Sequence, residues 1–121
     1  MTFEQDVARA ADELRRMDGI IANAIPAGVL AGAKYGADQA RQRAPRRTGK
    51  MADSIEARPG SDKNSAEVYA GVFYSYFVER GTRKPVRGAR PFMQPGIYGN
   101  RKRIGDIISQ AIAEAVEREM R

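Results

Sequence analysis

Apolar residues recur at helical spacing over the first part of the chain. One stripe of residues 4–22 is apolar, while Glu, Asp and Arg side chains occupy the opposite side. The stripe consists of Val7, Ala11, Leu14, Met17 and Ile21. This spacing predicts an amphipathic helix. Pro26 then either kinks one long helix or opens a second helix at its first turn, and both alternatives leave residues 1–44 helical.

Small residues recur at every fourth position in the second half of this region. They are Ala24, Gly28, Gly32, Gly36, Ala40 and Ala44. A glycine inside a helix costs about 0.5–1 kcal/mol relative to alanine, so three glycines on one stripe need a compensating role. We expect another helix to pack closely against the three glycines, within or between subunits. A ligand groove is the alternative.

Turn and strand signals follow the helical region. Pro45 ends the helix, because the residue before a proline is disfavoured in the helical conformation. Thr48 is a candidate N-cap for a short helical turn, and Gly49 provides the bend. Residues 55–58 and the alternating stretch 66–73 together predict an antiparallel β-hairpin.

A second amphipathic pattern begins at Ile97 and continues into the last helix. Its apolar stripe is rich in isoleucine and consists of Ile104, Ile107, Ile108, Ala111, Ile112, Ala115 and Val116. These bulky side chains are the natural counterpart of the glycine stripe. Between Gly81 and Pro95 no periodicity survives, and a loop of this length in a compact domain is usually functional or mobile.

These elements predict one α+β domain. N-terminal kinked helices and a C-terminal helix pack on a small antiparallel β-sheet, with a long basic loop. The 121 residues are too few for a second core. The expected divisions are 1–44 helical, 45–80 turns and β-hairpin, 81–96 an extended basic docking loop, and 97–121 the C-terminal helix.

The apolar fraction of 42% overstates the material available for a core. Alanine accounts for 19 residues, whereas Ile, Leu, Val and Phe together number only 22 of 121. That share lies below about 20%, a range typical of disordered chains. Long helix-compatible segments argue against disorder. We therefore expect a small core that neighbouring subunits complete, and hence a protein that assembles.

Catalytic chemistry finds little support. The chain has no Cys and no His, which excludes thiol chemistry, imidazole catalysis and zinc sites built on those residues. Its serines lie in no nucleophile motif, and Gly81 to Gly88 lacks the spacing of a phosphate loop. For Glu79 we expect an ion pair with a nearby Arg. We predict a non-enzymatic protein without metal or cofactor; a small hydrolase using Glu79 and a metal is the alternative.

A membrane partner is not expected. The uncharged stretch 19–33 holds fifteen residues, including Asn23 and Pro26, whereas a membrane span needs about 20 predominantly apolar residues. The stretch is therefore interpreted as buried helix in a soluble protein. The acidic, amphipathic N-terminus does not have the pattern of a signal peptide.

Positive charge is concentrated in the middle of the chain. Residues 41–103 carry 15 basic and 5 acidic side chains, a net of +10, whereas both ends are mildly acidic. Such a belt suits nucleic acid or an acidic protein surface, and a solvated basic face is the plain alternative. The candidate contacts with DNA are Arg43, Arg46, Arg47 and Lys50. Aromatic residues beside the belt form either a stacking platform or part of the core: Tyr69, Phe73, Tyr74, Tyr76 and Phe77.

Three short motifs occur in a fixed order. The first is Ala44, Pro45, Thr48, Gly49, Met51, Ser54 and Ile55; the second is Tyr76, Val78, Glu79, Gly81 and Thr82; the third is Arg90, Pro91, Phe92 and Pro95. In this order the chain, over roughly residues 30–121, resembles the neck and tail-completion proteins of lambda-type long-tailed bacteriophages. It departs mildly from their pattern, with Met51 where Leu is commoner and with Ser75 where Ala is usual.

This resemblance implies a structural virion protein. Such proteins form a ring, commonly six-fold, at the junction of head and tail, and DNA passes through the lumen. The implied partners are further copies of the chain, other phage neck and tail proteins and, nonspecifically, double-stranded DNA. The implied location is the virion, and the host cytoplasm during assembly. The alternative is a basic, sequence-nonspecific nucleic-acid-binding protein.

Within this interpretation the segment 82–95 docks onto an adjacent subunit or ring. Phe92 and Met93 form its apolar anchor, and the flanking prolines keep it extended. The expected docking residues are Tyr76, Glu79, Arg83, Lys84, Arg87, Arg90, Pro91, Phe92 and Met93. Turns are expected at Pro45, Thr48, Gly49, Gly81 and Thr82, with positive φ at the glycines; partner contact is the alternative role of these residues.

Overall fold

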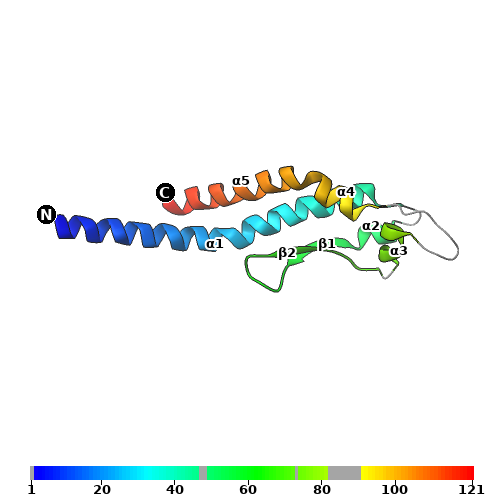
Figure 1. Cartoon of the computed structure of the whole chain (residues 1–121), viewed down its shortest axis with the longest axis horizontal. Helices are drawn as coiled ribbons and strands as arrows, with labels where there is room; N and C mark the ends of the chain where they lie inside the picture. Colours follow the sequence, from blue (N-terminus) through cyan, green and yellow to red (C-terminus); the bar gives the residue numbers. More distant parts are fainter. Residues whose placement is uncertain (1, 47–48, 73, 82–90) are drawn as a thin grey trace.

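The computed structural model describes residues 2–46, 49–72, 74–81 and 91–121, except for the side chain of Phe77. Its elements are α1 (Phe3–Arg43), α2 (Lys50–Asp53), β1 (Ile55–Pro59), β2 (Ala66–Ala70), α3 (Ser75–Arg80), α4 (Met93–Ile97), the 3-10 helix η1 (Tyr98–Asn100) and α5 (Arg101–Met120). The long helix α1 carries α5 on one side and the β1–β2 hairpin on the other (Figure 1). The described chain is mostly helical with a two-stranded antiparallel sheet, as the predicted class requires.

Helix α1 is one continuous helix, and Pro26 lies within it. The first of the two alternatives therefore holds. A capping box starts the helix: Gln5 N–H donates to Thr2 Oγ1 at 3.3 Å, and Thr2 N–H donates to Gln5 Oε1 at 3.0 Å. The helix ends at Ala44, which is extended with ψ 137°. Pro45 imposes that conformation on the residue before it, as predicted.

The glycine stripe of α1 faces the isoleucines of α5. A methyl group on Gly28 would lie 2.6 Å from Ile112 Cγ1, and one on Gly32 would lie 2.5 Å from Ile108 Cγ1. Side chains at these positions would hold the two helices apart. Glycine therefore allows isoleucine to sit directly against the α1 backbone, so the close helix packing expected from the sequence occurs inside the subunit.

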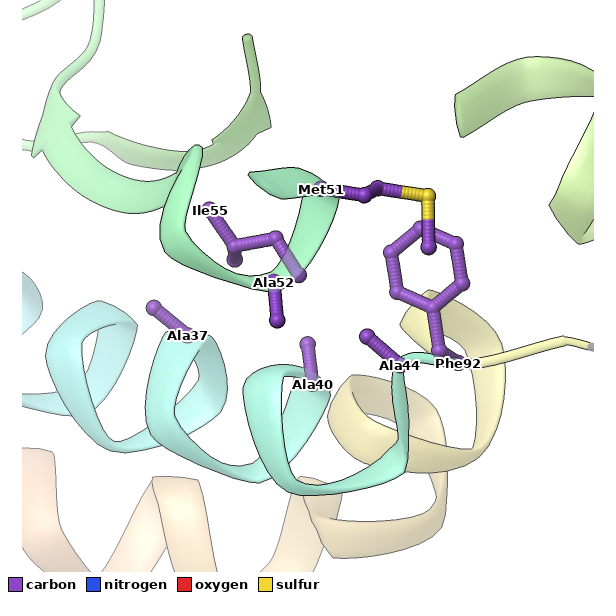
Figure 2. Close-up of a cluster of buried hydrophobic side chains, with 7 residues drawn as sticks. All are labelled: Ala37, Ala40, Ala44, Met51, Ala52, Ile55 and Phe92. Atoms are coloured by element: carbon purple, nitrogen blue, oxygen red, sulfur yellow. The ribbon is translucent and has the colours of Figure 1, made fainter. Parts of the chain in front are cut away.

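The hairpin covers the other side of α1. Its antiparallel register pairs Ile55 with Ala70 at one end and Pro59 with Ala66 at the other. The strand expected over 66–73 ends at Ala70. Beneath the hairpin is the buried core, shown in Figure 2, which consists of Ala37, Ala40, Ala44, Met51, Ala52, Ile55 and Phe92. Only Phe92 and Ile55 are large, fully buried side chains, so the core of the described chain is small.

The structure corrects the prediction of an extended, exposed docking segment around Phe92. Residues Met93–Ile97 form helix α4, and the Phe92 side chain is 0% exposed, packed beside Met51 in the core (Figure 2). Pro95 is compatible with this helix because it lies in the first turn, where backbone N–H groups have no partner within the helix. The apolar anchor expected for a neighbouring subunit is therefore buried within this one.

Two further local details differ from the sequence-based expectation. Gly49, with φ 78°, occupies the N-cap position of α2 where Thr48 was expected, and it provides no side-chain cap. Residues Ser75–Arg80 form helix α3, although no helix was predicted there. A six-residue helix is too short to show a helical period, and it gains little stability on its own.

Truncation of Phe92 separates a core role from a docking role. Phe92→Ala is expected to lower the free energy of unfolding by about 3–5 kcal/mol, because it leaves a cavity beside Met51. Phe3→Ala is the control, since Phe3 is 81% exposed and its loss changes stability by less than about 0.5 kcal/mol. Urea unfolding followed by circular dichroism measures both. An unchanged stability with impaired association would instead restore the docking role.

The approach of α4 to α1 is testable at Gly96. A methyl group there would lie 2.8 Å from the Cα and N atoms of Ala40, which are backbone atoms of α1. Gly96→Ala is therefore expected to lower the free energy of unfolding by about 1–3 kcal/mol. At Gly105, in α5, no atom lies within 4 Å of an added methyl group. Gly105→Ala is therefore expected to raise the free energy of unfolding by about 0.5–1 kcal/mol. Equal effects in urea titrations would contradict this packing.

Candidate assembly surfaces

The carboxylate of Glu79 joins α3 to α4. Glu79 Oε2 accepts hydrogen bonds from the backbone N–H groups of Phe92 at 2.7 Å and Met93 at 3.0 Å, and Oε1 accepts one from Gln94 at 2.9 Å. These three N–H groups start α4 and have no acceptor within their own helix. Glu79 therefore caps a helix that begins 14 residues later in the sequence, and it holds Phe92 in the core.

These hydrogen bonds determine the charge state of Glu79. Partial burial acts to raise its pKa, but the backbone N–H groups of Phe92, Gln94 and Met93 and the positive charge of Arg80 favour the ionised form, and the net pKa is lowered. The sequence predicted an ion pair with an arginine as its main contact. The contacts of Glu79 in the described chain are instead backbone donors, so its role here is structural.

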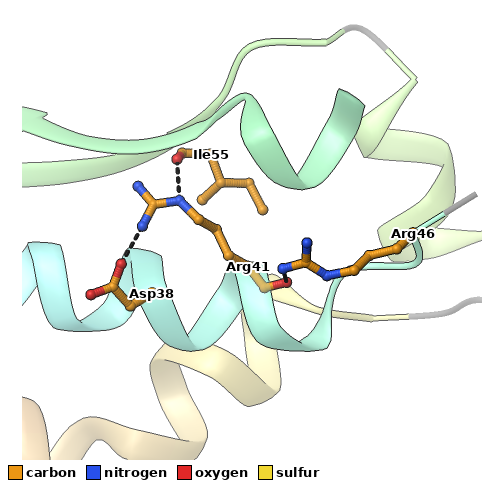
Figure 3. Close-up of polar contacts among 4 residues, drawn as sticks. All are labelled: Asp38, Arg41, Arg46 and Ile55. Atoms are coloured by element: carbon orange, nitrogen blue, oxygen red, sulfur yellow. Dashed lines mark hydrogen bonds and ion pairs between the residues drawn. The ribbon is translucent and has the colours of Figure 1, made fainter. Parts of the chain in front are cut away.

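Arg41, which the sequence did not single out, ties α1 to the hairpin (Figure 3). Its Nε donates to the carbonyl oxygen of Ile55 at 2.8 Å, and its Nη1 contacts Asp38. Arg46 Nη2 donates to the carbonyl oxygen of Arg41 at 2.9 Å. These bonds satisfy carbonyl groups near the end of α1 and at the start of β1, where the regular helix and sheet ladders leave acceptors free.

The expected DNA contacts lie at this same end of α1. Arg43 Nη1 donates to the Gln39 carbonyl oxygen at 3.1 Å and to Gln39 Oε1 at 2.8 Å. Arg43 and Lys50 are exposed, as is Arg46. Local hydrogen bonds position the Arg43 and Arg46 side chains without burying their charge, so contact with phosphate stays a prediction. Arg47 lies outside the described residues.

Exposed tyrosines accompany arginines on the basic half of the molecule. The Arg58 guanidinium lies 4.1 Å from the Tyr69 ring centre, and the Arg80 guanidinium lies 4.9 Å from that of Tyr76. Tyr98 is 66% exposed at the start of the last helical segment. Tyr74, by contrast, is half-buried and packs against the core. The aromatics beside the basic belt thus divide between core and surface, and the surface tyrosines are the docking candidates that the structure supports by exposure.

The first half of α1 carries a large exposed apolar stripe, on the face that the amphipathic spacing of residues 4–22 predicted to be apolar. Four of its large side chains are exposed: Phe3, Val7, Leu14 and Ile21. An open apolar recess of about 810 Å³ continues the stripe between α1 and α5, where Ile21 meets Ile112, Val116 and Met120. The amphipathic spacing had revealed the stripe, but its exposure depends on where α5 ends.

The remaining predicted site residues fall into three groups. Gly49 and Gly81 have positive φ values of 78° and 83°, which confirms the conformation expected of them. Pro91 is exposed and Met93 is half-buried against the core. The predicted residues that lie outside the described part of the chain are Arg47, Thr48, Thr82, Arg83, Lys84, Arg87 and Arg90.

No other kind of site is evident in the described segments. Acidic side chains there form no cluster of three or more that could hold a metal ion. None of the described helices is long and apolar enough to cross a membrane. The features that stand out there are exposed apolar and aromatic side chains on charged surfaces. Such surfaces are typical of sites that bind other macromolecules.

The Glu79 cap makes a prediction about pH. Glu79→Gln is expected to lower the free energy of unfolding by about 0.5–2 kcal/mol at pH 7, because a neutral amide caps less well. Since folding lowers the pKa of Glu79, its contribution is present above the unfolded value of about 4.3 and is lost as pH falls through the folded value. Urea titrations should therefore show that the difference in free energy of unfolding between Glu79→Gln and wild type becomes smaller below about pH 4.3. Glu56→Gln, on an exposed strand position, should show no such narrowing; a gap that persists in acid would contradict the cap.

Comparison with known proteins places the chain in a family. Residues 8–81 match the model of the HK97-gp10-like family, described as a tail component of bacteriophage HK97 gp10 type. The match covers more than half of the chain, from α1 to the end of α3, and includes the first of the three motifs and the second as far as Gly81. No curated protein and no solved structure matches the chain. The protein therefore belongs to the HK97-gp10-like family of bacteriophage tail components, and it is a structural protein, not an enzyme.

Proposed function

We propose that this tail component acts at the junction of head and tail, as a homo-oligomeric ring through which DNA passes. Family membership supports a role in the tail. The motif resemblance to neck and tail-completion proteins supports the junction and the six-fold ring. The partners are further copies of the chain and other neck and tail proteins, and the site of action is the virion.

The observation that carries this proposal is the surface that a single subunit leaves exposed. The chain exposes 8818 Å², whereas a compact folded monomer of 13.3 kDa is expected to expose roughly 6,400 Å². The difference, roughly 2,400 Å², is comparable with the area that obligate assemblies bury. A subunit with so much excess surface and so small a core is best explained as part of an assembly.

The side chains on this surface support contacts between copies. Tyr69, Tyr76 and Tyr98 are each at least 40% exposed, and tyrosine and arginine are the residue types enriched at protein interfaces. A Tyr–Arg pair offers apolar area with a polar edge, and it loses little side-chain entropy on burial. We assign the subunit contacts of the ring to this tyrosine-bearing half.

A second function is favoured by one observation, the net charge of +10 over residues 41–103. Arg43 and Arg46 are exposed at the end of α1, where they could neutralise phosphates without reading sequence. In the ring these arginines would line the DNA path. In a free-standing nucleic-acid-binding protein these arginines would themselves bind the nucleic acid.

Solution mass with and without DNA separates the two functions. Light scattering is expected to show a ring-sized species whose number of subunits does not change when short duplex DNA is added. Tyr98→Glu is expected to reduce this species to monomer. Tyr98→Phe, which keeps the ring, is the matched control. A monomer that binds duplex with steep dependence on salt would favour the nucleic-acid-binding function instead.

The junction itself is tested by assembly of the phage that encodes the chain. Without this protein, electron micrographs of lysates are expected to show filled heads and separate tails. Supplying wild-type protein should restore joined particles, whereas Tyr98→Glu should not. Complete virions formed in its absence would overturn the assignment to the junction.

A further inference from the structure

The exposed stripe of α1 is a strict heptad seam. Apolar residues recur at alternating spacings of four and three along Phe3, Val7, Ala10, Leu14, Met17, Ile21, Ala24 and Gly28. With Val7 at position a and Phe3 at position d, every a and d position from 3 to 28 is apolar. A repeat of seven residues keeps one stripe aligned with a neighbouring helix over its whole length, and it is the pattern of a coiled coil.

Helix α5 covers only one end of this seam. Gly28 contacts Ile112, and the recess beside Ile21 is lined by Val116 and Met120 in the last turns of α5. Helix α1 continues beyond the end of α5 (Figure 1). From Phe3 to Ile21 the uncovered part of the seam is about 27 Å long. It continues, on the same face, the surface on which α5 packs within the subunit.

The charges beside the seam are all of one sign. The e and g positions that flank residues 3–21 hold four charged side chains, Glu4, Asp6, Glu13 and Asp18, all exposed. Arginine occurs only at positions b and c, away from the seam, at Arg9, Arg15 and Arg16. Arg15 pairs with Asp12, which lies at position f. Within the described residues, none of the four seam carboxylates makes an ion pair or a side-chain hydrogen bond.

This charge pattern decides the occupant. In a parallel coiled coil, g positions face the e positions of the partner, whereas in an antiparallel one g faces g and e faces e. If a second copy docked by the same seam, either arrangement would place carboxylates opposite carboxylates. Like charges at these positions disfavour pairing. Among the described helices of this chain, none combines an exposed apolar seam with basic flanks. A second copy is therefore a poor occupant.

We infer that the seam from Phe3 to Ile21 docks an amphipathic helix of a different protein, one whose apolar stripe is flanked by Lys and Arg. The apolar residues provide the buried contact, and Glu4, Asp6, Glu13 and Asp18 select the partner by charge and fix its register. The docked helix continues the path of α5 along α1. This inference concerns α1 alone and does not depend on the ring.

Two synthetic helical peptides of about four heptads test it. Both carry Ile at a and Leu at d; one has Lys and the other Glu at every e and g position, so neither pairs well with itself. Fluorescence anisotropy with the full-length protein is expected to show at least about tenfold tighter binding of the Lys peptide, weakening with salt. Replacing Glu4, Asp6, Glu13 and Asp18 together with Lys should exchange the preference.

Point variants locate the binding on the seam. Leu14→Glu is expected to weaken binding of the Lys peptide by at least about tenfold, since the residue is 64% exposed and its replacement leaves the fold intact. Arg16→Glu, on the opposite side of the same helix, is the matched control and should retain binding. Circular dichroism checks that both keep their helix content.

Three outcomes would overturn the inference. Equal binding of the two peptides would mean that the acidic flanks select nothing. Binding of neither peptide would mean that the seam is not a docking surface for helices. Self-association of the protein that Leu14→Glu abolishes would make a second copy the occupant. The solution mass of the Tyr98→Glu variant distinguishes this last case from failure of the ring, because pairing through the seam would leave that variant a dimer instead of a monomer.

Discussion

The fold depends on how closely other elements can approach α1. Gly28 and Gly32 let isoleucines of α5 lie against the helix backbone, and alanines on the adjoining face let the hairpin and Phe92 approach from the other side. Each interior glycine costs about 0.5–1 kcal/mol in an isolated helix. The cost is offset only when a partner fills the space, because dispersion contacts fall off steeply with separation. The small residues of α1 thus allow close contact on two sides of the helix at once.

A second constraint holds the small core together. The Glu79 carboxylate satisfies the N–H groups that begin α4, and this places Phe92 over Met51 and Ala44. A charged group is suited to this task because three N–H donors stabilise the ionised carboxylate, which the lowered pKa reflects. With two large residues fully buried in the described chain, a single lost contact removes a large share of the packing. A core this small is therefore sensitive to single substitutions.

The surfaces of the molecule are segregated in a way that fits a tail component. The acidic first half of α1 carries the apolar seam, while the hairpin and α3 carry arginines paired with exposed tyrosines. One subunit can therefore use different chemistry toward different neighbours, with apolar burial supplying affinity and charge supplying selection. A structural component of a phage tail needs this kind of discrimination between neighbours more than it needs a catalytic site.

Local periodicity by itself determined the main elements of this protein. The apolar spacing identified α1 and α5, the alternation of residues 66–73 identified the hairpin, and the repeat of small residues identified the face on which α5 packs. The absence of Cys and His from the sequence excludes thiol and imidazole catalysis. These properties are readable because they repeat within a few residues or concern composition alone.

Tertiary structure alone decided the rest. The burial of Phe92, the helix α4 and the cap from Glu79 involve residues 13 or more positions apart, and no local pattern carries that information. The spacing of Val7, Leu14 and Ile21 showed an apolar stripe, but only the end of α5 shows that the stripe lies uncovered. A periodic pattern states which residues share a face. What covers that face depends on distant parts of the chain, or on another molecule.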